Sequence, residues 1–166
     1  MCGLCGILFE ERRRSAEERG HLLDIFTRLL VLSESRGNHA SGVDWVKADG
    51  SYGVFKAPMP ASELVRRKGY AEVLAAVDNK TTILMGHARW RTQGSETNNA
   101  NNHPLVLETL GNGRDAHALL VTHNGHISNA ETLFRRFHFP RQAQVDSEIL
   151  AHFAAAAATP DGWGMN

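Results

Sequence analysis

Short apolar segments, each ending in polar residues, constrain the fold of this chain more than any other feature. Residues 3–9 and 81–85 are too short and too apolar for a surface helix and are typical of buried strands. Between them, Ser15 and Glu18 form a capping box for an amphipathic helix that continues to Gly37. Buried strands that alternate with amphipathic helices predict a layered α/β or α+β fold.

Further elements are expected along the rest of the chain. The turn formers Asp49-Gly50 separate the two strands of a β-hairpin, residues 41–47 and 52–56. Segment 95–104 is rich in asparagine and is expected to be a loop. The remaining expected elements are helical turns between Ala61 and Val77, a strand from His117 to His123, a helix from a Ser128 and Glu131 capping box to Phe137, and a last helix capped by Asp146 or Ser147 that ends near Ala158.

Length and charge limit the possible partners. Residues 1–166 are expected to form one domain, which is long enough to bury a core without disulfides or metal. Lys plus Arg and Asp plus Glu number 18 each, so no net field would attract nucleic acid or a membrane surface. The two cysteines, Cys2 and Cys5, are too close in sequence to staple a fold, and no signal peptide or membrane span is recognisable. A reduced, cytoplasmic setting is therefore expected.

Cys2 is the first candidate for chemistry. Removal of Met1 would place an α-amine and a thiol on one residue, and the amine could then take the proton of the thiol without a histidine base. The alternative is that Cys2 is only a small apolar residue near a frayed terminus. The rest of the sequence has to decide between the two.

Asn124 and Gly125 follow a buried strand and offer a side-chain amide and an unhindered backbone N–H. Two such donors can form an oxyanion hole for an attacked amide. Read alone, Asn-Gly more often marks a type I′ hairpin turn. Because Ser128 begins a helix rather than a return strand, the hairpin is the weaker interpretation here.

An amino-acid substrate needs a fixed cation and a fixed anion. Arg89 can bind a carboxylate with two hydrogen bonds, and Thr92 can add a hydroxyl from the same segment. Asp146 at a helix N-terminus can meet an ammonium group. Alone, Arg89 is more simply a surface arginine and Asp146 a plain helix cap, so the interpretation depends on their combination.

In this combination the chain resembles the class II, N-terminal-nucleophile (Ntn) glutamine amidotransferases, including the glutaminase domain of glucosamine-6-phosphate synthase. The matching stretches occur in order: Cys2-Gly3, Arg36-Gly37 with Ala40-Ser41-Gly42, His87-Ala88-Arg89-Trp90 with Thr92 and Gly94, Asn102-His103-Pro104, His123-Asn124-Gly125 with Asn129, and Asp146-Ser147-Glu148. Ordered agreement over most of the chain is more specific than any one tripeptide.

The resemblance implies an α+β fold, the four-layer αββα sandwich of Ntn hydrolases, incomplete at the C-terminus. It also implies glutamine hydrolysis through a thioester on Cys2, with Asn124 and Gly125 as the oxyanion hole. The site residues that it implies besides these are Arg89, Trp90, Thr92 and Asp146 for substrate binding, and Arg36, Gly37 and His103 as supporting residues. The expected partners are glutamine, an ammonia-accepting synthase domain or subunit and a possible second copy in a homo-oligomer, with no cofactor and no metal.

Some features depart from the family pattern. Gln93 stands where glucosamine-6-phosphate synthase has a histidine, which removes one contact to the substrate carboxylate. Met1 would block the α-amine if it were retained, and further strands would be expected after the last helix. An inactive glutamine-binding or regulatory module of the same fold is therefore the alternative function. The Cys2-x-x-Cys5 spacing leaves a weaker redox or metal alternative.

Overall fold

Within the residues that the structure describes, the larger of two antiparallel sheets forms around its longest strand, β4 (Thr81–Arg89). The structure is a computed structural model that describes residues 1–109 and 117–157. The strands of the larger sheet are, in spatial order, β1 (Gly3–Leu8), β4 (Thr81–Arg89), β2 (Ala40–Lys47) and β3 (Tyr52–Ala57). Gly3 pairs with Ala88, and Ala40 pairs with Arg89, so the start of β1 and the start of β2 lie on either side of the end of β4.

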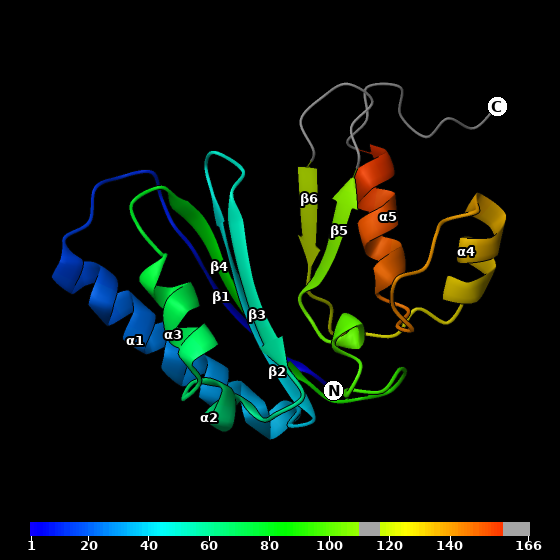
Figure 1. Cartoon of the computed structure of the whole chain (residues 1–166), viewed down its shortest axis with the longest axis horizontal. Helices are drawn as coiled ribbons and strands as arrows, with labels where there is room; N and C mark the ends of the chain where they lie inside the picture. Colours follow the sequence, from blue (N-terminus) through cyan, green and yellow to red (C-terminus); the bar gives the residue numbers. More distant parts are fainter. Residues whose placement is uncertain (110–116, 158–166) are drawn as a thin grey trace.

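Three helices cover one face of this sheet (Figure 1). They are α1 (Ala16–Ser33), α2 (Ala61–Leu64) and α3 (Lys68–Ala75), and the short 3-10 helix η1 (Glu34–Arg36) follows α1. Phe26 and Leu30 of α1 pack with Val43 and Leu84 of the sheet in the main hydrophobic core. Ser15 caps α1 by accepting the N–H of Glu18 (3.0 Å), so the predicted capping box is confirmed at its serine.

The second face of the larger sheet meets a smaller layer (Figure 1). The hairpin of β5 (Leu105–Thr109) and β6 (His117–Val121) forms this layer, and α5 (Glu148–Ala157) and α4 (Ala130–Phe137) lie beyond it. The 3-10 helix η2 (Asn99–Asn101) precedes β5. The layers therefore run helices, sheet, sheet, helices, and the α+β sandwich predicted from the sequence is confirmed.

The segment before β5 lies directly on β2. A Cβ atom built on Gly42 would come within 2.1 Å of the His103 carbonyl oxygen, so only glycine leaves room for this contact. From β3, the Lys56 ammonium donates to the carbonyls of Asn102 and Pro104, at 2.7 Å each. These contacts hold segment 102–104 between the two sheets.

Several element boundaries differ from the sequence predictions. β4 continues past Met85 to Arg89, whereas β6 ends at Val121 rather than His123. The strand β5 was not predicted. The expected capping box at Ser128 is wrong, because α4 begins after Asn129 and Asn129 makes no capping side-chain bond. The predicted end of the last helix near Ala158 lies outside the described residues.

No helix in ranges 1–109 and 117–157 has both the length and the apolar character that crossing a bilayer requires.

Candidate active site

The Cys2 sulfur lies against the backbone of Trp90, just beyond the end of β4. The Trp90 N–H donates to Cys2 Sγ at 3.3 Å, and the thiol can donate to the Trp90 carbonyl at 3.6 Å. Arg36 Nε donates to the Cys2 carbonyl at 3.1 Å. The antiparallel pairing of Gly3 with Ala88 explains this geometry, because Cys2, which precedes Gly3, then lies beside the residues that follow Ala88.

Segment 36–39 packs directly on the backbone that holds the sulfur. A Cβ on Gly37 would lie 2.4 Å from the Arg89 carbonyl carbon and from the Trp90 nitrogen. His39 Nδ1 accepts the Arg91 N–H at 3.0 Å, and the His39 ring lies 4.9 Å from the Trp90 ring. Arg36 and Gly37 were expected at this place from the motif. His39 was not, because its neighbours along the chain carry no pattern that points to Arg91.

The Arg89 guanidinium is buried and holds the loop that follows it. Nη1 donates to Asn102 Oδ1 at 2.8 Å, and Nη2 donates to the carbonyls of Gln93 and Gly94. Burial lowers the pKa of Arg89, although a guanidinium remains charged. In this conformation protein groups therefore occupy the donors expected to bind a substrate carboxylate. Thr92 is exposed in the same loop.

Three histidines connect the end of β4 to the segment after β6. The rings of His87 and His103 stack at 4.4 Å, and His87 Nε2 lies 3.2 Å from the His123 carbonyl oxygen. His103 Nδ1 accepts the His123 N–H at 3.3 Å. Burial lowers the pKa of His87 to about 4 and that of His103 to about 2, so both rings are neutral acceptors and donors near neutral pH.

Asn124 and Gly125 are exposed directly after this histidine contact. His123 Nδ1 bonds to Ser147 Oγ at 2.9 Å, which ties the segment to the start of α5. Asp146 is buried, and its Oδ2 accepts the Ile127 N–H at 2.6 Å and lies 3.3 Å from His126 Nδ1. The Asp146 carboxylate therefore fixes the backbone that follows Gly125.

The predicted site residues gather in two groups at one end of β4. Cys2, Arg36, Gly37 and Trp90 form the first group, and Arg89 adjoins it. The second group consists of His103, His123 and Asp146. Asn124 and Gly125 directly follow His123 in the sequence. His87 joins the groups, since it lies two residues before Arg89 and contacts both His103 and His123.

Cys5 takes no part in this cluster. Its side chain packs on the helix-covered core, and burial raises the pKa of its thiol to about 11. Both cysteines are free thiols. Across residues 1–109 and 117–157, no group of three or more His, Cys, Asp or Glu side chains is arranged to hold a metal ion.

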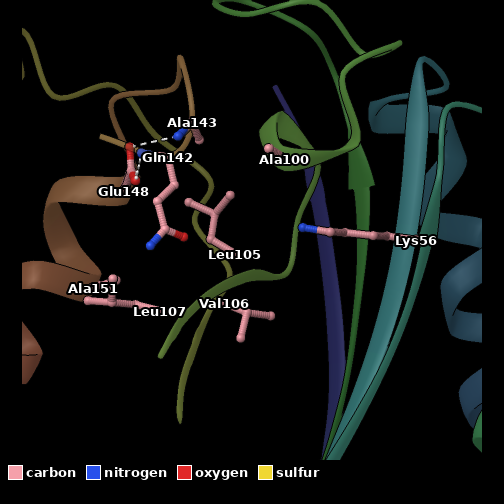
Figure 2. Close-up of a pocket in the computed structure, with 9 residues that line it drawn as sticks. All are labelled: Lys56, Ala100, Leu105, Val106, Leu107, Gln142, Ala143, Glu148 and Ala151. Carbon is pink, nitrogen blue, oxygen red and sulfur yellow. Dashed lines mark hydrogen bonds between the residues drawn. The ribbon is translucent and has the colours of Figure 1, made fainter. Parts of the chain in front are cut away.

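A separate cavity lies between β3 and α5 (Figure 2). Lys56 approaches it from the larger sheet, and the Glu148 carboxylate closes the opposite side by accepting the N–H groups of Gln142 and Ala143. None of the predicted site residues lines this cavity. Burial lowers the pKa of Lys56 to about 8.

Comparison with known proteins finds similarity to part of glutamine–fructose-6-phosphate aminotransferases. No family model matches it. It is 32% identical over 92% of its length to a glutamine–fructose-6-phosphate aminotransferase (isomerizing) of Pyrobaculum aerophilum, and 32% identical over 91% to that of Corynebacterium diphtheriae. The chain covers 22% of each of these proteins, so it spans about a fifth of their length.

Solved structures support the same fold. The glutamine phosphoribosylpyrophosphate (PRPP) amidotransferase from B. subtilis, complexed with ADP and GMP, matches with a TM-score of 0.62 and 21% identity, over 96% of this chain and 30% of that one. A structure described as the allosteric regulatory enzyme of purine biosynthesis matches with a TM-score of 0.66 and 23% identity, over 95% and 30%. At these identities the likeness concerns the fold, and it confirms the one expected from the motifs.

Proposed function

We propose, from the premise that this chain is a relative of the class II glutamine amidotransferases, that residues 1–166 form a glutaminase domain that hydrolyses glutamine to glutamate and ammonia. The observation that carries the proposal is the position of the Cys2 sulfur. It accepts a hydrogen bond from the N–H of Trp90, the residue that follows the buried cation Arg89. A nucleophile beside a cation suits an amino-acid substrate whose carboxylate must be held while its side-chain amide is attacked.

The first half of the reaction forms a thioester. Once Met1 is removed, the Cys2 α-amine takes the thiol proton as the sulfur attacks the amide carbon of glutamine. Met1 is 79% exposed, so a processing peptidase can reach it. The Asn124 side-chain amide and the Gly125 N–H donate to the resulting oxyanion. Collapse of this intermediate breaks the carbon–nitrogen bond, and the amine returns a proton to the leaving ammonia.

The second half uses water. The α-amine deprotonates a water molecule that attacks the thioester, and the carbon–sulfur bond breaks to release glutamate and restore the thiol. One glutamine and one water thus give one glutamate and one ammonia. Asp146 would bind the substrate ammonium group, and Thr92 would add a contact to the carboxylate.

Substrate binding requires a rearrangement of the loop after β4. Arg89 Nη2 now donates to the carbonyls of Gln93 and Gly94, and a substrate carboxylate would replace these acceptors. The loop would then move away from the guanidinium while Asn102 keeps its bond to Nη1. Exposed Trp90 would help to close the pocket over the bound substrate.

The ammonia would pass to a synthase domain or subunit. This part of the proposal is supported by the curated relatives, in which a region similar to this chain makes up 22% of the protein. The molecule that accepts the ammonia, and the number of copies in any homo-oligomer, would be determined on the assembled protein.

The proposal is tested by N-terminal mass spectrometry combined with a glutamate-release assay. Protein that begins at Cys2 should release glutamate from glutamine, and Cys2→Ala should abolish release. Cys5→Ala is the matched control, because it removes the other thiol while leaving the nucleophile, and it should retain activity.

Protein that begins at Cys2, folds and yet releases no glutamate would refute the glutaminase proposal. If the same protein were stabilised by glutamine, and Cys2→Ala bound glutamine equally well, the non-catalytic binding module would be the better description.

A further inference from the structure

His39 makes contacts that the proposed reaction does not yet use. Its side chain is half-buried beside the end of β4, one residue before the start of β2. Its own N–H donates to the Arg89 carbonyl at 3.1 Å, which extends the pairing of β2 with β4 by one bond. The side chain therefore projects from a backbone that is fixed relative to Arg89.

Two distinct parts of the imidazole contact the residues that hold the nucleophile. Nδ1 accepts the Arg91 N–H at 3.0 Å, which fixes the peptide that follows Trp90. The ring contacts the Trp90 indole at a centroid distance of 4.9 Å and an interplanar angle of 55°. The Trp90 N–H donates to Cys2 Sγ, so Trp90 is the residue through which His39 is connected to the sulfur.

We infer that His39 is a positioning residue for the nucleophile: its Nδ1 acceptor and its ring hold the Trp90–Arg91 backbone so that the Trp90 N–H points at the Cys2 sulfur. This inference rests on the proposed function. The N–H that donates to sulfur stabilises the thiolate, and its orientation decides how the sulfur faces the substrate amide. The described hydrogen bonds and ring contacts of the His39 side chain are to Arg91 and Trp90 and not to the sulfur itself.

Alternative roles for His39 make different demands on its chemistry. A residue that only filled space would be replaced well by any ring of similar size. A positioning residue must also accept a hydrogen bond at the place of Nδ1. His39→Phe keeps a ring and loses the acceptor, whereas His39→Asn loses the ring and keeps an acceptor at a similar distance from the backbone. The pair of variants therefore separates the two contacts.

The experiment measures glutamate release and the alkylation of Cys2 by iodoacetamide, followed by peptide mass spectrometry with Cys5 as the internal reference. Loss of one neutral hydrogen bond corresponds to about a tenfold effect. We expect His39→Phe to lower kcat about tenfold with a smaller change in KM, and to slow Cys2 alkylation. His39→Asn should recover most of both rates. Thermal unfolding shows whether each variant is folded.

Unchanged or faster Cys2 alkylation in folded His39→Phe would overturn the inference, and so would His39→Asn that is as impaired as His39→Phe. Alkylation by iodoacetamide needs no glutamine site, so it reports on His39 even if the protein released no glutamate. Failure of the proposed function and failure of the positioning role are thus distinguishable.

Discussion

At the scale of single residues, the candidate site depends on a glycine, Gly37, as much as on residues with functional side chains. Gly37 lies where the Arg89–Trp90 peptide passes 2.4 Å from the position of a Cβ atom. Its backbone is extended, so the requirement for glycine comes from space and not from an unusual φ angle. Any side chain at this position has to push the peptide that holds the Cys2 sulfur.

We therefore expect Gly37→Ala to lower glutamate release about a hundredfold, since a shift of about 1 Å at a reacting group can cost that much. Overpacking should also lower the free energy of unfolding by about 1 to 3 kcal/mol. Gly20→Ala is the control, because Gly20 is exposed within α1 and no atom outside its own stretch of helix lies within 4 Å of its Cβ position. It should keep full activity and gain about 0.5 to 1 kcal/mol. Equal activity in the two variants would contradict the role of Gly37.

Asp44 is a second residue of interest, because its burial should make the stability of the protein depend on pH. It is 1% exposed on β2, and within the described part of the chain neither carboxylate oxygen has a hydrogen-bond partner. Burial raises its pKa to about 7. An acid whose pKa is raised by folding favours the protonated folded state, so stability is lost as pH rises from the unfolded value near 4 to about 7.

Asp44→Asn removes this titration while preserving shape. The difference between about 7 and the ordinary value of 3.8 corresponds to roughly 4 kcal/mol at 1.36 kcal/mol per pH unit, taken as an order of magnitude. The variant should be more stable than wild type at pH 8 by up to that amount and nearly equal to it near pH 4, as measured by urea unfolding. A constant difference across this range would show that Asp44 is not held neutral by burial.

At the scale of elements, the sequence predicted most strands and helices but not the parts whose contacts are distant. The helix α1 and the hairpin of β2 and β3 were predictable because capping and turn residues act locally. The end of β4 was missed, since residues 86–89 follow no apolar alternation and are buried by distant segments. Gly86 faces Phe26 and Leu30 of α1, whereas His87 and Arg89 contact segment 102–104. The strand β5 was missed because five residues after a polar loop carry little signal until β6 and α5 cover them.

The same reasoning explains which candidate site residues the sequence could suggest. Cys2, Asn124 and Arg89 occur in motifs whose chemistry can be read from adjacent residues. His39 and Lys56 act through bonds to backbone atoms of Arg91, Asn102 and Pro104, and no local pattern encodes such bonds. Only the fold brings these partners together.

Lys56 links β3 to segment 102–104 and gives an element-scale prediction. Lys56→Met keeps the apolar stem but removes both bonds to the carbonyls of Asn102 and Pro104. Stability should change little, because the lost bonds are offset by relief of a buried ammonium whose pKa is lowered to about 8. Amide hydrogen exchange in residues 101–105 should accelerate, and KM for glutamine should rise about tenfold through looser support of Arg89.

Lys68→Met is the control for this change. Lys68 is an exposed residue of α3, and its 3.3 Å ion pair with Glu72 contributes only about 0.3 to 0.5 kcal/mol. It should leave both exchange and KM unchanged. Unaltered exchange in Lys56→Met would mean that β5 and η2 hold segment 102–104 without the ammonium.

At the scale of the whole molecule, the space between the two sheets concentrates groups that titrate differently in the folded and unfolded states. His87 and His103 have pKa values lowered by burial, whereas that of Asp44 is raised. Between pH 5 and pH 6 the unfolded chain binds about one more proton at each histidine, and the folded protein binds about one more at Asp44. The net excess is about one proton on the unfolded chain.

Stability should therefore rise with pH across this window by about 1 kcal/mol per pH unit from these three groups. The sign follows from the two histidines. Their contribution to the free energy of unfolding is complete above the ordinary histidine pKa near 6.5, and it is lost as pH falls toward their pKa values in the folded protein.

His103→Gln removes the proton that His103 binds on unfolding. The slope of the free energy of unfolding against pH should therefore fall by about 1.4 kcal/mol per pH unit relative to wild type. Urea unfolding at pH 5.0, 5.5 and 6.0 measures both slopes, and other titrating groups cancel in the difference. A slope that His103→Gln leaves unchanged would mean that His103 is as easily protonated in the folded protein as in the unfolded chain, and that the two sheets do not exclude water from this ring.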